Sequence, residues 1–199
     1  MTLVLATRNR GKIREMHSVL GDLPVRILSA LDYPELPPVA EDGLTFRDNA
    51  IKKAESVCSC LGLPSLADDS GLEIDFLDGQ PGVFSSRFAG PESDDRMNIA
   101  KVLSLLSGIP PEKRNARFRC IIALAAPGET TRTVEGQCSG VIAAEPRGIA
   151  GFGYDPIFIV PEYDQTFAEL GPEIKNRISH RARALARARL LLQDLRPQP

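Results

Sequence analysis

The chain has 199 residues, of which 43% are hydrophobic and 25% are charged, a composition typical of a globular protein and unlike that of a disordered or collagenous chain. This length favours one folding unit over residues 1–199, either a single domain or two closely packed lobes. The formal net charge of -2 gives no overall attraction for a nucleic acid backbone, so a phosphate ligand would have to be held by a local group of positive side chains.

The first elements follow a strand, loop, helix order. Residues 3–6 form an uninterrupted apolar run, which predicts a buried strand. A helix is expected from Gly11, because apolar positions recur at steps of three and four residues until Gly21 and Pro24 end the pattern. A second helix is expected over residues 45–61, where one face is apolar.

The middle and the end of the chain alternate between the two kinds of element. Residues 65–67 and 72–76 predict two short strands, with the segment Asp-Asp-Ser-Gly between them. A helix is expected at 94–106, strands at 117–126, 131–138 and 157–160, and a last helix at 178–195, with residues 196–199 frayed. The Pro127-Gly128 turn favours an antiparallel hairpin. We therefore predict an α/β fold in which helices flank a mixed sheet.

The cysteines and the apolar segments indicate a compartment. Cys58, Cys60, Cys120 and Cys138 match no paired zinc-binding spacing, and we interpret them as buried free thiols. The opening apolar run is too short for a signal peptide. No stretch approaches the roughly 20 apolar residues of a membrane helix. These features predict a cytoplasmic protein without a membrane segment.

The loop after the first strand, ATRNRGK at residues 6–12, is a candidate phosphate site. A helix start offers backbone donors and a favourable dipole to phosphate. The loop is not a Walker A motif, which would need glycine at Ala6 and a hydroxyl residue at Ile13. Taken alone, a polar loop that caps the helix is an equally good interpretation.

Acidic residues form the second candidate group. Asp68 and Asp69 are expected at the end of a strand, and Glu41 and Asp42 precede the second helix. Mg²⁺ prefers carboxylate oxygens and usually takes one or two of them together with substrate phosphates. On spacing alone, a common turn is the better explanation of Asp-Asp-Ser-Gly.

Two later segments offer groups that a nucleotide site needs. GFGYDP at residues 151–156 is glycine-rich but lacks the dinucleotide-binding spacing, and Phe152 is either a ring for a base or ordinary loop packing. Lys175, Arg177, His180 and Arg181 precede an arginine-rich helix, where a solvated basic face is the alternative to a binding site.

Taken together, these motifs resemble the Ham1-like (inosine triphosphate pyrophosphatase) family. The segments that carry the resemblance are ATRNRGK, EDGLTFRDNAIKKA, ADDSGLEID, PGVFSSRFAG, GFGYDPIF and ISHRARAL, between residues 6 and 185. The resemblance implies an elongated, two-lobed α/β subunit with a nucleotide cleft between the lobes, commonly a homodimer. It also implies Mg²⁺-dependent hydrolysis of purine nucleoside triphosphates such as ITP, dITP and XTP to the monophosphate and pyrophosphate, with no nucleic acid or membrane partner.

Residue roles follow from the resemblance by position. Glu41 and Asp69 would bind Mg²⁺, Asp69 would also be the general base, and Ser70 would assist substrate binding. The triphosphate would be held by the first loop, Thr7, Arg8, Asn9, Arg10, Gly11 and Lys12. The sugar and base would be surrounded by Phe152, Gly153, Tyr154, Asp155, Lys175, His180 and Arg181. Donors from the last two are expected to meet the purine 6-carbonyl.

The chain departs from the family pattern at two positions. Arg8 stands where many relatives have glycine, and either strengthens phosphate binding or faces solvent. Ala40 replaces the first of two acids, so the pair becomes Glu41-Asp42. Which of Glu41, Asp42 and Asp68 contacts the metal stays open.

Three other functions compete with this one. Maf-like pyrophosphatases have a similar fold and prefer pyrimidine nucleotides, but the Ser-His-Arg segment argues against them. A non-catalytic nucleotide sensor would keep Lys12, Lys175 and Arg181 without a base, and Asp68 and Asp69 disfavour it. A structural or interaction protein leaves the clustering of polar motifs without a cause.

Overall fold

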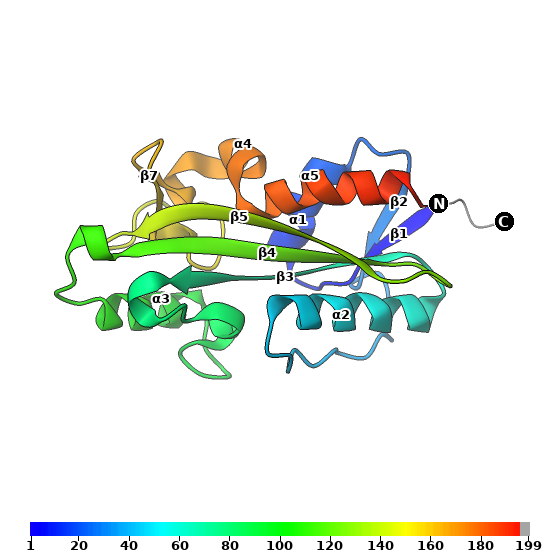
Figure 1. Cartoon of the computed structure of the whole chain (residues 1–199), viewed down its shortest axis with the longest axis horizontal. Helices are drawn as coiled ribbons and strands as arrows, with labels where there is room; N and C mark the ends of the chain where they lie inside the picture. The colour runs from blue at the N-terminus through cyan, green and yellow to red at the C-terminus, as the bar shows by residue number, and fades with distance from the viewer. Residues whose placement is uncertain (196–199) are drawn as a thin grey trace. The chain divides into compact units, whose positions relative to one another are not determined.

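The computed structural model describes residues 1–195 and divides into two compact units built from interleaved segments. Unit 1 contains residues 1–69, 120–136 and the described chain from 181 onward, and unit 2 contains residues 70–119 and 137–180. The strands form a seven-stranded sheet in the order β2-β1-β3-β4-β5-β6-β7 (Figure 1). The chain therefore passes between the units several times.

The elements have the following bounds. The strands are β1 (Thr2–Leu5), β2 (Arg26–Ser29), β3 (Ser65–Ile74), β4 (Asn115–Ala125), β5 (Arg132–Ile142), β6 (Phe158–Val160) and β7 (Gln165–Thr166). The α-helices are α1 (Arg10–Leu20), α2 (Phe46–Leu61), α3 (Asp95–Leu105), α4 (Phe167–Ile178) and α5 (His180–Gln193). Short 3₁₀ helices include η1 (Asp75–Leu77), η2 (Gly82–Arg87) and η4 (Asp155–Ile157).

The sheet is mixed, as predicted. Strand β1 pairs in parallel with β2 and β3, whereas β6 pairs antiparallel with β5 and β7. Strands β4 and β5 are neighbours joined by residues 126–131, a connection too short for a parallel crossover. The predicted α/β fold with a mixed sheet and at least one hairpin is confirmed.

Helices cover both faces of the strands in unit 1. Helix α2 lies on one face, and α1 and α5 lie on the other (Figure 1). Asn9 caps α1 and Thr45 caps α2, each by accepting a backbone N–H of the first turn, which satisfies a donor that the helix cannot pair itself. The core beneath α1 and α5 contains Leu3, Leu5, Met16, Leu20, Leu66, Ile122, Leu124, Ala184, Leu185, Ala188 and Leu192.

Unit 2 has its own core, centred on aromatic rings. The rings of Phe118 and Phe158 lie 4.6 Å apart between centroids, and those of Phe158 and Phe167 lie 5.2 Å apart. Helix α4 starts with a capping box between Thr166 and Glu169, which fixes its first turn. Among residues 1–195, every helix falls short of the length and apolar character that crossing a bilayer requires.

The structure corrects the sequence predictions at several places. The two strands expected at 65–67 and 72–76 are one strand, β3, and η1 follows it, so Asp68 and Asp69 lie inside a strand and not in a turn at its end. Strands β2 and β7 and helix α4 were not predicted, and the last helix begins at His180. The predicted fraying of residues 196–199 lies outside the described residues.

Candidate functional site

Asp68 and Asp69 are adjacent on β3 but contact different helices of unit 1. Successive side chains of a strand point to opposite faces of the sheet. Asp68 accordingly meets Lys12 of α1 and Arg181 of α5, whereas Asp69 meets Lys53 of α2. Both carboxylates are buried, at 1% and 5% exposure. The continuous strand therefore gives two neighbouring acids two separate environments.

The first cluster joins Asp69, Glu41 and Lys53. The Lys53 ammonium lies 2.8 Å from Oδ1 of Asp69 and 2.8 Å from Oε1 of Glu41. Nδ2 of Asn49 donates to Oδ2 of Asp69 at 3.2 Å, and Oδ1 of Asn49 accepts the backbone N–H of Gly43 at 2.8 Å. Asn49 therefore ties the turn that carries Glu41 to the strand that carries Asp69.

Asp42 does not belong to this cluster. Its carboxylate pairs with Lys52 at 2.6 Å, and its side chain is 71% exposed. Asp68 is also committed elsewhere, to Lys12 and Arg181. Of the three acids left open by the sequence, Glu41 is the one that lies beside the same cation as Asp69.

Burial and charge set the acid–base character of this cluster. Burial raises the pKa of Asp69 above its ordinary value, and the opposing charge of Lys53 does not reverse the shift. Burial lowers the pKa of Lys53, but attraction to Asp69, Asp68 and Glu41 outweighs it and leaves that pKa raised. A carboxylate with a raised pKa is a stronger base than an ordinary one, while Lys53 keeps its charge.

The second cluster surrounds Asp68. Its Oδ1 lies 3.0 Å from the Lys12 ammonium. Its Oδ2 accepts hydrogen bonds from Nε and Nη2 of Arg181, at 3.1 and 3.0 Å. Arg181 also pairs with Glu15. Burial alone would raise the pKa of Asp68, but the charges of Lys12, Arg181 and Lys53 leave it well below its ordinary value. Asp68 is therefore a fixed negative charge that positions two cations.

The first loop continues directly into the N-terminus of α1. Oδ1 of Asn9 accepts the backbone N–H of Lys12 at 3.1 Å, and Oγ1 of Thr7 accepts that of Asn9 at 3.2 Å. The first turn of α1 holds no acidic residue and includes Arg10, so its dipole and side chains favour an anion. The Arg8 guanidinium donates to the carbonyl of Leu36 at 2.6 Å.

In unit 2, the GFGYDP loop is organised around a buried carboxylate. Asp155 is 1% exposed, accepts the backbone N–H of Phe152 at 2.9 Å and pairs with Lys175. The Lys175 ammonium lies 4.6 Å from the centroid of the half-buried Phe152 ring. Tyr154 donates its hydroxyl to the carbonyl of Ser85 at 2.8 Å. These buried contacts fix the loop, and the half-buried Phe152 ring remains partly accessible.

His180 and Arg181 are both buried in this structure. The His180 ring stacks on Phe118 in unit 2, with centroids 4.6 Å apart and planes 13° apart. Arg181, in unit 1, is 2% exposed and donates to two carboxylates. Their contact with a purine 6-carbonyl concerns a bound substrate and stays a prediction.

The structure thus assembles the predicted residues as two sets. Unit 1 brings Glu41, Asp69 and Arg181 together with the first loop, residues 7–12. Unit 2 holds Ser70, a half-buried residue of β3, and His180, together with the 152–155 loop and Lys175.

Sequence reasoning missed Asn49 and Lys53. Both are polar, almost fully buried at 1% and 7% exposure, and one helical turn apart on the apolar face of α2. A buried lysine needs a charged partner. A lysine and an asparagine at positions that the helical period assigns to the core were the available signal.

The donor set of the first cluster fits magnesium. One cation, the Lys53 ammonium, already lies within 2.8 Å of an oxygen from Glu41 and one from Asp69, so the two carboxylates converge. Residues 1–195 contain no group of three or more His, Cys, Asp or Glu side chains arranged to hold a metal. Two carboxylates, completed by water and substrate phosphates, are what Mg²⁺ commonly takes.

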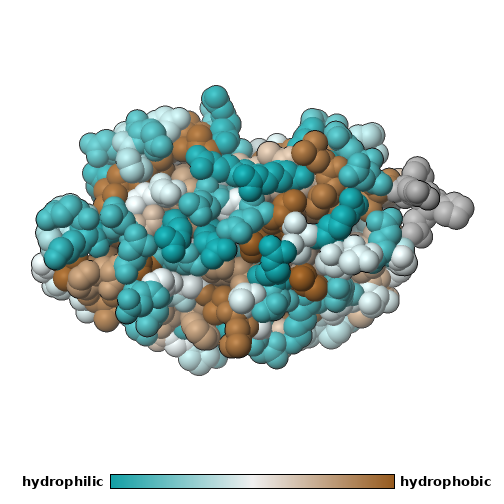
Figure 2. Space-filling view, viewed as in Figure 1, coloured by the Kyte–Doolittle hydropathy of each residue, from teal (hydrophilic) through white to brown (hydrophobic). Residues whose placement is uncertain are grey.

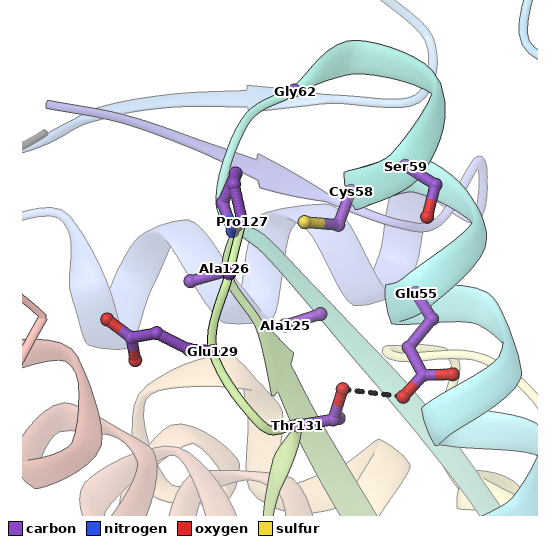
Figure 3. A pocket seen from close by; sticks show the side chains of 10 residues that line it. Glu55, Cys58, Ser59, Gly62, Ala125, Ala126, Pro127, Glu129 and Thr131 are labelled. Carbon is purple, nitrogen blue, oxygen red and sulfur yellow. Dashed lines mark hydrogen bonds between the residues drawn. The ribbon is translucent and has the colours of Figure 1, made fainter.

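A separate pocket of about 420 Å³ lies in unit 1, between α2 and residues 125–131 (Figure 3). Its walls carry two acidic side chains, Glu55 and Glu129, and Thr131 donates to Glu55 at 2.7 Å. None of the described residues that line it is Lys or Arg. This pocket is therefore unsuited to a triphosphate.

Comparisons with known proteins agree with these motifs. A sequence model of the Ham1 family matches residues 3–190. The chain is 54% identical to a dITP/XTP pyrophosphatase of Desulforamulus reducens, over 98% of this chain and 97% of that protein, and 50% identical to one of Bacillus subtilis, over 96% of each. Its fold is similar to that of a HAM1 protein from Coxiella burnetii, with a TM-score of 0.88, 44% identity, and coverage of 98% of this chain and all of that one. On these grounds the chain belongs to the Ham1 family.

Proposed function

We propose that this chain hydrolyses purine nucleoside triphosphates with non-standard bases, ITP, dITP and XTP, to the nucleoside monophosphate and pyrophosphate. The relatives named above are dITP/XTP pyrophosphatases. The observation that carries the proposal is the cluster of Asp69, Glu41 and Lys53 in the same unit as the phosphate-binding loop. A base, a pair of metal ligands and an anion site are the parts that this reaction needs.

The triphosphate is bound by the start of α1. Backbone N–H groups at a helix N-terminus hold phosphate oxygens, and Lys12 adds a full charge. Asp68 keeps the Lys12 ammonium in place at 3.0 Å before substrate arrives. Thr7, Asn9 and Arg10 complete the polar surface of the loop.

Glu41 and Asp69 would hold Mg²⁺. When bound, the ion neutralises charge on the triphosphate and on the departing pyrophosphate. Asp69 accepts a proton from the attacking water, whose oxygen forms a bond to the α-phosphorus. The bond from that phosphorus to the bridging oxygen breaks, and pyrophosphate leaves with the electron pair. Lys12 stabilises the growing charge, so catalysis is electrostatic and needs no nucleophilic side chain.

Recognition of the base is assigned to Phe152, His180 and Arg181. Phe152 offers its ring for stacking, and Lys175 and Asp155 fix the loop that presents it. Hypoxanthine and xanthine carry a 6-carbonyl that accepts a hydrogen bond from His180 or Arg181. Adenine has an amino group there and leaves such a donor unpaired, which disfavours it.

We also propose that the protein is a cytoplasmic homodimer. The family resemblance supports the dimer. For the compartment, the support is that all four cysteines are free thiols in the structure, although only Cys58, Cys120 and Cys138 are buried as predicted and Cys60 is exposed.

A panel of nucleoside triphosphates tests the proposal. Release of pyrophosphate from ITP, dITP, XTP, ATP, GTP and pyrimidine triphosphates is measured with Mg²⁺ and with excess chelator. Fast release from the first three, abolished by the chelator, is the expected result. Preference for a pyrimidine triphosphate, or release of orthophosphate only, would contradict it.

A further inference from the structure

Lys53 occupies the position between the two proposed metal ligands. Its ammonium is 2.8 Å from an oxygen of Glu41 and 2.8 Å from an oxygen of Asp69. The Lys53 side chain is 9% exposed and that of Asp69 is 8% exposed, so water screens the Lys53–Asp69 pair weakly, whereas the Glu41 side chain is 35% exposed and its pair with Lys53 is screened more. The ammonium is thus the cation that holds the two carboxylates together in this structure.

The neighbouring lysine provides a contrast. Lys52 pairs with Asp42 at 2.6 Å, but the two side chains are 45% and 71% exposed. Exposed ion pairs of this kind contribute little free energy, because water and salt screen them. The two lysines differ in burial and in the number of carboxylates they contact, whereas the lengths of their shortest ion pairs, 2.8 and 2.6 Å, are similar.

The charge of the cluster makes the Lys53 ammonium and a divalent ion compete for the carboxylates of Glu41 and Asp69. Two carboxylates and one ammonium carry one net negative charge, and adding a divalent ion beside Lys53 would turn it into one net positive charge in a poorly solvated place. That excess is costly unless Lys53 leaves the carboxylates or an anion arrives. A triphosphate supplies several negative charges.

We propose that Lys53 is a resident counter-cation that competes with the divalent ion for Glu41 and Asp69, so that the metal binds well only together with the triphosphate. The inference rests on the proposed metal site. Its consequence is positive coupling between metal and nucleotide, each raising the affinity of the other. Displaced from the carboxylates, the Lys53 ammonium is a donor for the incoming phosphates.

Binding of Mn²⁺ to the nucleotide-free protein, followed by electron paramagnetic resonance, tests the proposal. Lys53→Met and Lys53→Gln, which remove the charge and differ in polarity, should each bind Mn²⁺ at least about tenfold more tightly than the wild type. The matched control Lys52→Met should stay within about twofold. Circular dichroism selects the variants that are folded, and Gln keeps a hydrogen-bond donor for Asp69 if Met is not tolerated.

A double variant tests whether the gain in Mn²⁺ affinity depends on Glu41. Adding Glu41→Gln to Lys53→Gln should abolish the gain, because one of the two competing ligands is gone. Equal or weaker Mn²⁺ binding by the folded Lys53 variants, or a gain that survives Glu41→Gln, overturns the proposal. These measurements involve no turnover, so an enzyme that is inactive on the nucleotide panel but shows the gain would contradict the proposed function and leave this inference standing.

Discussion

At the scale of single residues, the two acids of β3 differ because they lie on opposite faces of one strand. Asp68 meets two cations and has a strongly lowered pKa, whereas the pKa of Asp69 is raised. The first is suited to hold positive groups in place, and the second to accept a proton. Substitution by asparagine should therefore have different consequences at the two positions.

Asp69→Asn should abolish turnover, since the amide is nearly isosteric but cannot accept a proton, and should leave nucleotide binding largely intact when it is measured without Mg²⁺, because Asp69 is also a proposed metal ligand. Loss of a general base is worth roughly 10²- to 10⁴-fold in rate. The kcat and the dissociation constant for ITP are the quantities to measure. A kcat within about threefold of the wild-type value, a change far smaller than the loss expected for a missing base, would show that Asp69 is not the general base.

Asp68→Asn should instead reduce stability, because it removes the buried counter-charge of Lys12 and leaves Arg181 with Glu15 as its remaining ion-pair partner. Breaking such a pair costs about 3–5 kcal/mol. Since the folded-state pKa of Asp68 lies below its ordinary value of 3.8, its contribution is complete above that value and is lost as pH falls through the folded pKa.

The free energy of unfolding, measured by urea titration from pH 7 to pH 3, provides the check. The difference in free energy of unfolding between the wild type and Asp68→Asn should be constant near neutrality and begin to decrease only at pH values around 4 and below. A gap that closes already between pH 7 and pH 5 would contradict the assignment.

At the scale of elements, the loop before η4 depends on glycine. Gly151 has a φ of 81°, and a Cβ there would collide with the Asp155 carboxylate. Gly153 has a φ of 61°, and a Cβ at that position would have no atom within 4 Å. The two glycines share a strained conformation and differ in the space around them.

Gly151→Ala should therefore displace Asp155 and raise the KM for ITP at least about tenfold, because loss of a well-placed binding group is worth more than 1 kcal/mol. Gly153→Ala, in the same proposed binding loop, is the comparison: it should cost the strain of a positive φ, about 1 kcal/mol of stability, and raise the KM less than Gly151→Ala because it does not displace Asp155. Equal KM values for the two variants would show that Asp155 does not position the loop.

Element type followed from the sequence wherever a period and an end signal occurred together. Helix α2 is an example, with an apolar face and Gly62 in the left-handed conformation after its last residue. Strand β3 was divided wrongly because Asp-Asp-Ser-Gly has turn propensity, and the ion pairs that stabilise it inside a strand come from α1, α2 and α5. Helix α4 was missed because Gly171 and Pro172 interrupt it with a kink.

Contacts between elements also limited the prediction of the site. The family resemblance, and not motif spacing, made Asp69 and Lys12 candidates, because it assigns a role to each of these positions. The partners Lys53 and Glu15 lie on helix faces whose orientation only the folded structure supplies. Asp68 and Asp42 were equivalent to Glu41 in sequence and are separated from it by tertiary contacts alone.

At the scale of the whole molecule, the exposed apolar side chains bear on assembly. Hydrophobic residues on the face drawn in Figure 2 occur in separate small groups among hydrophilic ones. Several large apolar side chains of unit 2 are exposed, Phe76, Phe84, Met97 and Tyr163. Apolar side chains exposed singly are ordinary on a protein surface, and a contiguous patch of them would be needed to locate a subunit contact.

We expect size-exclusion chromatography with light scattering to give twice the chain mass of 21.6 kDa. The dimer should persist on dilution through the micromolar range, as an interface of standard size allows. A mass of one chain at every concentration would contradict the homodimer without affecting the proposed chemistry.

The most direct test of the central claim is the fate of oxygen during hydrolysis of dITP in H₂¹⁸O, followed by ³¹P nuclear magnetic resonance. Attack of water on the α-phosphorus predicts dIMP and pyrophosphate as the products, with the heavy oxygen bonded to the phosphorus of dIMP. Heavy oxygen in pyrophosphate, or formation of dIDP and orthophosphate, would contradict it.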